Sequence, residues 1–224
     1  MDLITHEFKD QSFKFIQTVT AKDLIDEIFS DNYKILEKNI KFNDGDIIVD
    51  LGACEGMFSI MMSKLFPQTK IISLEPVPST YYNLVKNIEL NECKNIDAVN
   101  LGVGKYEDDF MSVVVNKSGH AGGSTSFCTF NPDIHEKTTI NIISLDELFD
   151  IHDIKKCKLL KIDVEGAEYD ALYNSSILYR VENLVGELHV NTRLQYESRR
   201  PDGLANWLNN QTNVIHLEIC KMAE

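Results

Sequence analysis

Short apolar runs alternate with amphipathic stretches along most of this chain. The apolar runs are rich in isoleucine, leucine and valine, as are the buried strands of a parallel sheet. They predict strands at 46–51, 70–75, 95–100, 158–163, 182–189 and 212–219. The amphipathic stretches between them predict helices at 56–66, 78–91, 144–150, 166–173 and 202–210. Strands separated by helices indicate an α/β fold with a doubly wound, mostly parallel sheet.

Two segments depart from this alternation. Residues 1–45 suggest a strand at 12–19 and a helical stretch at 22–39, broken near Asp31-Asn32, and such a segment commonly covers a sheet edge or lids a ligand site. Residues 108–142 combine β-prone runs with a polar, glycine-rich loop, which predicts a β-rich insertion. We therefore expect one domain at 46–224, preceded by a covering segment and carrying one insertion.

The run Asp50-Leu-Gly-Ala-Cys-Glu-Gly56 follows the first predicted strand of the sheet and opens a helix. Glycines there allow close backbone approach to a ligand, although a plain strand-to-helix turn would look similar. The next strand ends at Glu75, where a carboxylate can accept hydrogen bonds from a ribose diol. Dinucleotide sites use three glycines, and acids beside the loop would repel a pyrophosphate. The pattern therefore favours S-adenosylmethionine, whose sulfonium and ammonium are cationic.

A second block, Lys158-Leu-Leu-Lys-Ile-Asp-Val-Glu-Gly-Ala-Glu168, is a predicted strand that ends in acids. Asp163 falls at the strand's carboxyl end, where open α/β sheets bind ligands. Acids in the first turn of a helix also complement its dipole. That explanation accounts for Glu168 but poorly for Asp163 and Glu165.

Together these motifs resemble the FkbM-type methyltransferase family. The similarity covers roughly residues 46–190, with Val49-Asp-Leu-Gly-Ala-Cys-Glu-Gly56, Leu74-Glu-Pro76 and Leu160-Lys-Ile-Asp-Val-Glu-Gly-Ala-Glu168 in the family's order. The resemblance implies a seven-stranded class I (Rossmann-like) methyltransferase fold that uses S-adenosylmethionine. It also implies methylation of hydroxyls on sugars or small natural products, with the glycine loop at the methionine end and Glu75 at the ribose. The chain departs from the family at Cys54-Glu55, and only Asn213 to Cys220 stands where the family has a final β-hairpin.

These motifs define the predicted cofactor site. With adenine expected after the third strand, its residues are Asp50, Gly52, Ala53, Cys54, Glu55, Gly56, Glu75, Pro76, Leu101, Gly102 and Asp163.

Methyl transfer to a hydroxyl requires removal of its proton. A histidine can act as the base that removes this proton, and His189 and His120 are the candidates. The alternative is a divalent metal such as Mg²⁺, which Asp163, Glu187 and His189 could bind from two neighbouring strand ends. His189 could also simply bond to a neighbouring loop. The predicted catalytic residues are Asp163, His189, Glu187 and His120, and the predicted substrate contacts are Ser124 and Glu165.

The overall charge narrows the range of partners. The chain carries 22 basic and 35 acidic residues, a net charge of −13, which argues against a nucleic-acid surface. We expect a small-molecule or carbohydrate substrate. The sequence leaves open whether the chain forms a homo-oligomer. An RNA ribose 2′-O-methyltransferase is the alternative enzyme, since Lys161, Asp163 and Glu187 resemble a lysine–acid catalytic set. A non-catalytic S-adenosylmethionine-binding scaffold is another alternative.

The cysteines and the amino-terminal sequence bear on location. Five scattered cysteines without metal-binding spacing favour reduced thiols and a cytoplasmic location. The sequence shows neither a signal peptide nor an apolar run long enough to span a membrane, so no membrane partner is expected.

Overall fold

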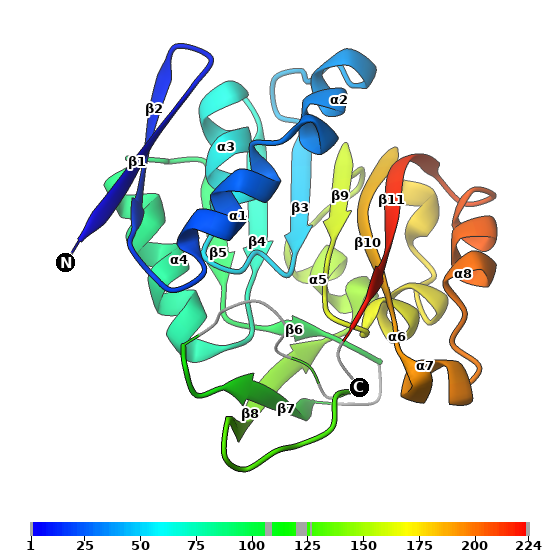
Figure 1. Ribbon diagram of the computed structural model, residues 1–224. Helices are drawn as coiled ribbons and strands as arrows, with labels where there is room; N and C mark the ends of the chain where they lie inside the picture. Colours follow the sequence, from blue (N-terminus) through cyan, green and yellow to red (C-terminus); the bar gives the residue numbers. More distant parts are fainter. Residues whose placement is uncertain (1, 106–108, 120–124, 126, 223–224) are drawn as a thin grey trace.

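A parallel six-stranded sheet forms the centre of the molecule, which is described here from a computed structural model (Figure 1). The structure describes residues 2–105, 109–119, 125 and 127–222. The sheet order is β11-β10-β9-β3-β4-β5, and every neighbouring pair is parallel. The strands are β3 (Ile47–Leu51), β4 (Lys70–Leu74), β5 (Ile96–Val99), β9 (Leu159–Ile162), β10 (Asn183–Val190) and β11 (Asn213–Lys221). This confirms the predicted α/β fold class. Within the described residues the sheet has six strands and not the seven that the resemblance implies.

Helices cover both faces of the sheet, which is why most residues of its central strands are apolar on both sides. Neighbouring residues Ile71 and Ile72 are both fully buried, but they belong to different hydrophobic clusters on opposite faces. One face packs against α3 (Met57–Leu65), and the other packs against α5 (Leu145–Ile151), α6 (Glu168–Tyr173) and α8 (Pro201–Leu208). The remaining helices of the domain are α4 (Pro78–Leu90), the short 3₁₀ turn η1 (Leu178–Arg180) and α7 (Thr192–Tyr196). The sequence pattern did not predict η1 and α7, which are each about one turn long.

The amino-terminal segment forms a β-hairpin followed by two helices. The strands β1 (Leu3–Phe8) and β2 (Gln11–Ile16) pair antiparallel, and α1 (Ala21–Ile28) and α2 (Asp31–Asn39) are separated at the predicted break. The strand β1 was not predicted from the sequence pattern. The hairpin turn places Lys9 and Asp10 at φ of 49° and 59° without the glycine that usually marks such a turn. Phe13 and Phe15 are fully buried in the same cluster as the sheet residue Ile48, so this segment packs directly against the domain.

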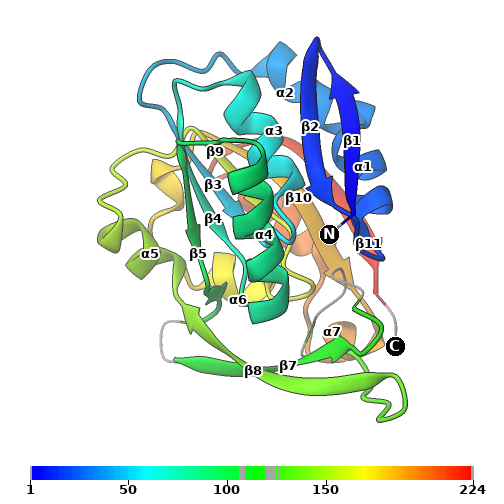
Figure 2. The ribbon, with the colours of Figure 1, turned by 90° about the vertical axis from the view of Figure 1, so that its left-hand side faces the viewer.

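The insertion forms a second, smaller sheet of order β6-β8-β7. Its strands are β6 (Gly102–Val103), β7 (Phe110–Asn116) and β8 (His135–Ile143), and β7 and β8 pair antiparallel. Figure 2 shows β7 and β8 lying crosswise below the carboxyl ends of the central strands. Val77 at the start of α4 packs against Val113, Ile140 and Ile142 of the insertion. The β-rich insertion is therefore confirmed, and it covers the sheet edge where ligands bind in this type of fold.

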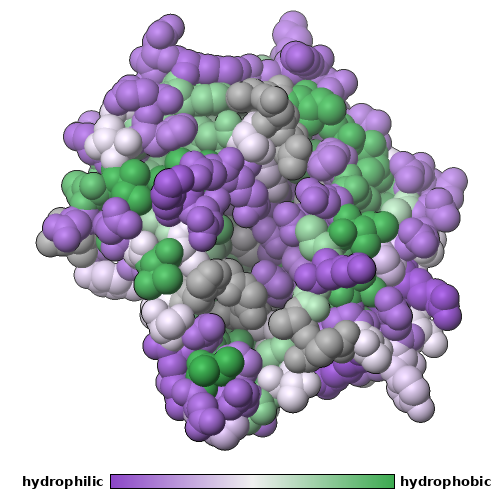
Figure 3. All heavy atoms as spheres, in the orientation of Figure 1, coloured by the Kyte–Doolittle hydropathy of each residue, from purple (hydrophilic) through white to green (hydrophobic). Residues whose placement is uncertain are grey.

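In the parts of the chain that the structure describes, no helix combines the length and the apolar character needed to cross a bilayer. Figure 3 shows hydrophilic residues over most of the face seen in Figure 1, with hydrophobic residues in separate groups. Scattered apolar side chains of this kind are normal on a protein surface.

Gly186 is expected to be indispensable for this sheet. It lies within β10 at φ 146°, and a Cβ added there would lie 1.8 Å from the carbonyl oxygen of Ile162 on β9. Gly186→Ala should lower the free energy of unfolding by about 3 kcal/mol, measured by urea denaturation. The control is Gly203→Ala in α8, where the nearest atom lies 3.8 Å from the added Cβ. That change should be neutral or stabilise by up to about 1 kcal/mol. Similar losses from both substitutions would contradict this account of the β9–β10 contact.

Candidate active site

A pocket opens at the carboxyl edge of the central sheet, between the amino-terminal helix α1 and the insertion. The ends of β3, β4, β5, β9 and β10 form its floor, and many of the predicted site residues line it. These predicted residues are Gly52, Cys54, Glu75, Pro76, Leu101, Gly102, Asp163, Glu165 and Glu187. Residues from five strand ends thus converge on one cavity, as expected for a ligand site in an open α/β sheet.

Four predicted cofactor residues are not among those that line the pocket. Asp50 is fully buried beneath it, Ala53 is 4% exposed, and Gly56 begins α3 with φ 90°. Glu55 is 1% exposed, and its carboxylate accepts hydrogen bonds from Thr18 Oγ1 (2.8 Å) and Asn83 Nδ2 (3.0 Å). This placement corrects the expectation that the Glu55 side chain faces the ligand, because its carboxylate is bonded to the protein instead.

Gly52 allows the ends of β3 and β9 to approach each other. Its φ is 79°, and an added Cβ would lie 1.8 Å from the carbonyl oxygen of Asp163. The amide of Asp163 in turn donates to the carbonyl of Leu51 at 3.0 Å. The glycine is therefore required by contact within the protein, in addition to any approach of a ligand.

Glu75 is held rigidly beside the glycine loop. One carboxylate oxygen accepts from the Cys54 amide at 3.1 Å, and the other accepts from the Val77 amide at 2.8 Å. The side chain is only 6% exposed yet lines the pocket. Burial raises the pKa of Glu75 to about 8, although both amide hydrogen bonds oppose the shift. Each oxygen can accept a further hydrogen bond, so the site suits a donor such as a ribose hydroxyl.

A buried lysine connects the strand ends below the pocket. Lys161 Nζ lies 3.0 Å from the Gly52 carbonyl oxygen, 3.3 Å from Asp163 Oδ2 and 3.5 Å from Asp50 Oδ1. Burial by itself lowers the pKa of Lys161, but the charges of Asp163 and Asp50 raise it well above its ordinary value. Burial raises the pKa of Asp50 despite Lys161 and a 2.6 Å hydrogen bond from Ser59 Oγ. A buried cation with two acids therefore underlies the site.

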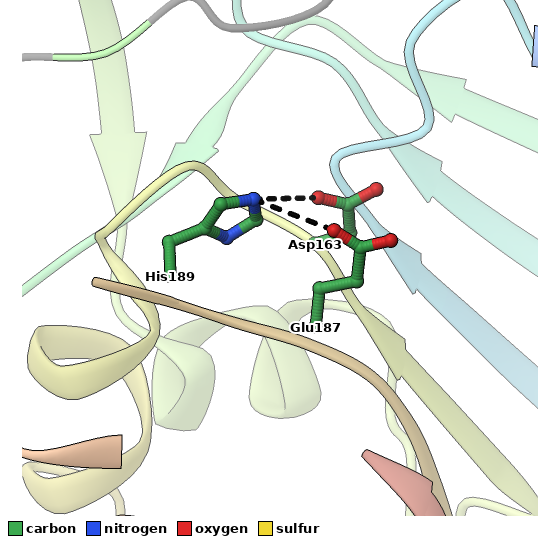
Figure 4. A group of neighbouring side chains, drawn as sticks. All are labelled: Asp163, Glu187 and His189. Atoms are coloured by element: carbon green, nitrogen blue, oxygen red, sulfur yellow. Dashed lines mark ion pairs between the residues drawn. The ribbon is translucent and has the colours of Figure 1, made fainter. Parts of the chain in front are cut away.

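His189 faces a group of acids from β10 and the loop after β9. Its Nε2 lies 3.5 Å from Glu187, 3.5 Å from Glu165 and 3.9 Å from Asp163. Figure 4 shows the imidazole pointing toward the Asp163 and Glu187 carboxylates. One ligand atom from each of Asp163, Glu187 and His189 lies within 4.8 Å of the others. The three residues predicted as metal ligands are therefore brought together.

The other imidazole nitrogen of His189 is occupied. Nδ1 lies 2.8 Å from Glu168 Oε1, and Glu168 is fully buried. Burial lowers the pKa of His189, but the Glu168 hydrogen bond and the charges of Glu168, Glu165 and Asp163 outweigh it and raise the pKa to about 10. The surrounding acids therefore favour the charged form of the ring in the ligand-free protein.

The two remaining predicted site residues, His120 and Ser124, lie outside the described residues. The adjacent part of the insertion contacts the site directly. Thr125 Oγ1 donates to the Glu165 carbonyl at 2.6 Å, and Asn191 Nδ2 donates to the Phe127 carbonyl at 3.0 Å. Thr125 and Phe127 both line the pocket.

The amino-terminal segment closes the opposite side of the pocket with Leu24 and Glu27 of α1. Polar contacts hold this segment in place. Thr18 donates to Glu55, as described above, and the Ile16 amide donates to Asn87 Oδ1 at 2.9 Å. The sequence analysis suggested a covering role for the segment but did not identify Leu24 or Glu27. Because these residues reach the pocket only through tertiary packing, no local motif marked them.

Comparison with known proteins agrees with this geometry. The model of the methyltransferase FkbM domain matches residues 50–221, which is most of the chain. The chain belongs to the FkbM methyltransferase family. This confirms the resemblance that the sequence motifs indicated.

Two fungal proteins are similar to this FkbM-family chain. "Methyltransferase 1" of Beauveria bassiana is 30% identical over 148 residues, 58% of this chain and 59% of that protein. "Methyltransferase sdnD" of Sordaria araneosa is 28% identical over 189 residues, 72% of this chain and 71% of that protein. The chain thus spans about three fifths of the first relative's length. A solved precorrin-6y C5,15-methyltransferase from Geobacter metallireducens has a TM-score of 0.39 at 15% identity, covering 68% of this chain and 57% of that one.

The raised pKa of Glu75 predicts a pH-dependent stability. Between the ordinary value of 4.5 and about 8, the folded protein retains a proton that the unfolded chain releases. The stabilising contribution of this proton to the free energy of unfolding is therefore fully present below pH 4.5, and it is lost as the pH rises through about 8. Glu75→Gln should remove this loss. Between roughly pH 5 and pH 9 the free energy of unfolding of the variant should therefore fall by about 4 kcal/mol less than that of the wild-type protein. Urea denaturation without cofactor measures both slopes, and parallel slopes would contradict the buried, protonated Glu75.

Proposed function

We propose that this protein transfers a methyl group from S-adenosylmethionine to a hydroxyl oxygen of a sugar or small natural product. The observation that carries the proposal is a single pocket that joins Glu75, the carboxylate suited to a ribose, to Asp163 and Glu187 beside His189. Family membership supports the transfer, and the acceptor is our own inference.

The chemistry of the pocket fits a cationic cofactor. Glu27, Glu75, Asp163, Glu165 and Glu187 line it, and no lysine or arginine appears among its described lining residues. Such a lining favours a sulfonium and an ammonium and opposes a pyrophosphate. When bound, S-adenosylmethionine supplies an electrophilic methyl group. Gly52 and Cys54 would lie along its methionine end, and Leu101 and Gly102 beside its adenine.

The acceptor would lie over the acids at the ends of β9 and β10. There Asp163, Glu165 and Glu187 can accept a hydrogen bond from the reacting hydroxyl and hold its oxygen in line. Leu24 of α1 and Phe127 of the insertion flank this region and would exclude water from it. A neutral small molecule suits this surface better than a polyanion, in keeping with the net charge of −13.

A divalent cation such as Mg²⁺ is part of this proposal. Asp163, Glu187 and His189 would hold it, and their two carboxylates and one imidazole form a donor set suited to Mg²⁺ or Mn²⁺. The cation would supply a lowered pKa of the acceptor hydroxyl. It would also neutralise acids that otherwise repel one another.

Two other functions compete with this proposal. An RNA ribose methyltransferase would need Lys161 at the reacting hydroxyl, but Lys161 is 3% exposed and its ammonium is bonded to Gly52 and Asp163. No observation in the described residues favours that function. A non-catalytic scaffold that binds S-adenosylmethionine would show cofactor affinity without turnover, which the experiments below detect.

Cofactor binding tests the first half of the proposal. Calorimetric titration should show binding of S-adenosylmethionine and S-adenosylhomocysteine, with no binding of NAD. Glu75→Ala should weaken binding at least about tenfold, because it removes the acceptor for hydrogen bonds from the ribose hydroxyls. The matched control is Glu89→Ala, an exposed acid on α4 that pairs with Lys86. Absence of binding to the folded wild-type protein would refute the cofactor assignment.

Metal removal tests the second half. We expect one Mn²⁺ to bind per chain, measured by calorimetry or electron paramagnetic resonance, with at least a tenfold loss of affinity in Asp163→Asn and His189→Gln. Glu89→Gln serves as the control, because Glu89 is an exposed acid on α4 that pairs with Lys86 and belongs to neither group of clustered ligands. Methylation of a panel of hydroxylated acceptors should stop with chelator and return with Mg²⁺. Undiminished turnover after chelation would remove the metal from the mechanism.

A further inference from the structure

We infer that Glu168 is a positioning residue that orients the imidazole of His189 toward the acids of the site. The inference deepens the proposed function and rests on it, because His189 matters only if the acid cluster holds a metal or a hydroxyl. The sequence pattern had explained Glu168 by its place in the first turn of a helix. Its contacts in the structure point to a second role.

The carboxylate of Glu168 is fixed from three sides. Oε1 accepts from the Val164 amide and the Gly166 amide, both at 3.2 Å, and lies 2.8 Å from His189 Nδ1. Glu168 is fully buried, and among the residues that the structure describes none hydrogen-bonds to its Oε2. Because the loop after β9 clamps this acid, the carboxylate presents a fixed acceptor to the imidazole.

The consequence for His189 is a defined tautomer and ring direction. With Nδ1–H donated to Glu168, only Nε2 remains to face the acids, and Glu165 and Glu187 lie 3.5 Å from it. A carboxylate behind a histidine in this way orients the ring and increases its basicity as a ligand. Without Glu168 the ring could rotate or present Nδ1 to the cluster.

The helix dipole alone does not explain this arrangement. Asp170 also lies in the first turn of α6, but its carboxylate pairs with Arg199 away from the cluster. Glu168 instead bonds to a histidine on β10, a strand distant from it in sequence. Burying a carboxylate costs free energy unless it is paired, so the pairing with His189 is a specific feature of this fold.

The test compares Glu168→Gln with Tyr169→Phe. Gln keeps the volume and an acceptor for the loop amides but loses the charge that faces His189. We expect a 10- to 100-fold loss of Mn²⁺ affinity and a changed ¹⁵N signal of the His189 ring, with S-adenosylmethionine affinity unchanged. Tyr169 donates to the His189 backbone carbonyl at 3.0 Å and does not bond to the ring. Tyr169→Phe should therefore change stability while leaving metal affinity and the ring signal unchanged.

A double-mutant cycle distinguishes positioning from a purely structural role. In a His189→Gln background, Glu168→Gln should cause no further loss of Mn²⁺ affinity, because its effect passes through the imidazole. Additive losses, or an unchanged ring signal in Glu168→Gln, would overturn the inference. If Glu168→Gln does not fold, Glu168→Asp replaces it in the same cycle.

The readouts also separate this inference from the proposed function. If the wild-type protein binds S-adenosylmethionine but no Mn²⁺, the metal is excluded from the proposed function. The ¹⁵N signal of the His189 ring alone then decides the role of Glu168. Wild-type protein that binds no S-adenosylmethionine would refute the proposed function, whatever the ring signal shows.

Discussion

The candidate site depends on the buried charge of Lys161. Its ammonium lies within 3.5 Å of Asp50, the Gly52 carbonyl and Asp163, so it ties the end of β3 to the end of β9. Loss of this cation would leave Asp50 as an uncompensated charge in the core, a situation that generally costs several kcal/mol. Because Asp163 both pairs with Lys161 and lines the pocket, the same contact supports the fold and sets the position of an acid in the site.

Closure of the pocket depends on polar contacts made by segments far apart in the sequence. Glu55 continues the cofactor loop, yet its carboxylate holds Thr18, just before α1. On the other side, Thr125 of the insertion donates to the Glu165 carbonyl. The glycine loop and the acid-rich turn thus each hold one of the segments that cover the pocket. Their residues shape the cofactor site and also the region where an acceptor would bind.

Local patterns predicted the parts of the structure that local physics governs. The apolar strands, the glycine turn and the break between α1 and α2 follow from side-chain periodicity and backbone freedom over a few residues. The strand β1 escaped prediction because its turn lacks glycine, and α7 because it is only about one turn long. Asp163, Glu187 and His189 could be grouped from sequence, since parallel strands end at one edge and side chains alternate along them. Their partner Glu168 could not, because the dipole explanation already accounted for it.

The sequence by itself determined the fold class, the family and the edge of the sheet where the site lies, because these depend on periodic burial and short motifs. Only the tertiary structure decided which acids of those motifs enter the pocket. Asp50 and Glu55 lie within two residues of a glycine of the loop, yet both are buried against protein partners. Glu27, in contrast, reaches the pocket from a distant helix. The direction of a side chain is set by which partner satisfies its charge. Such partners come together only when the whole chain packs.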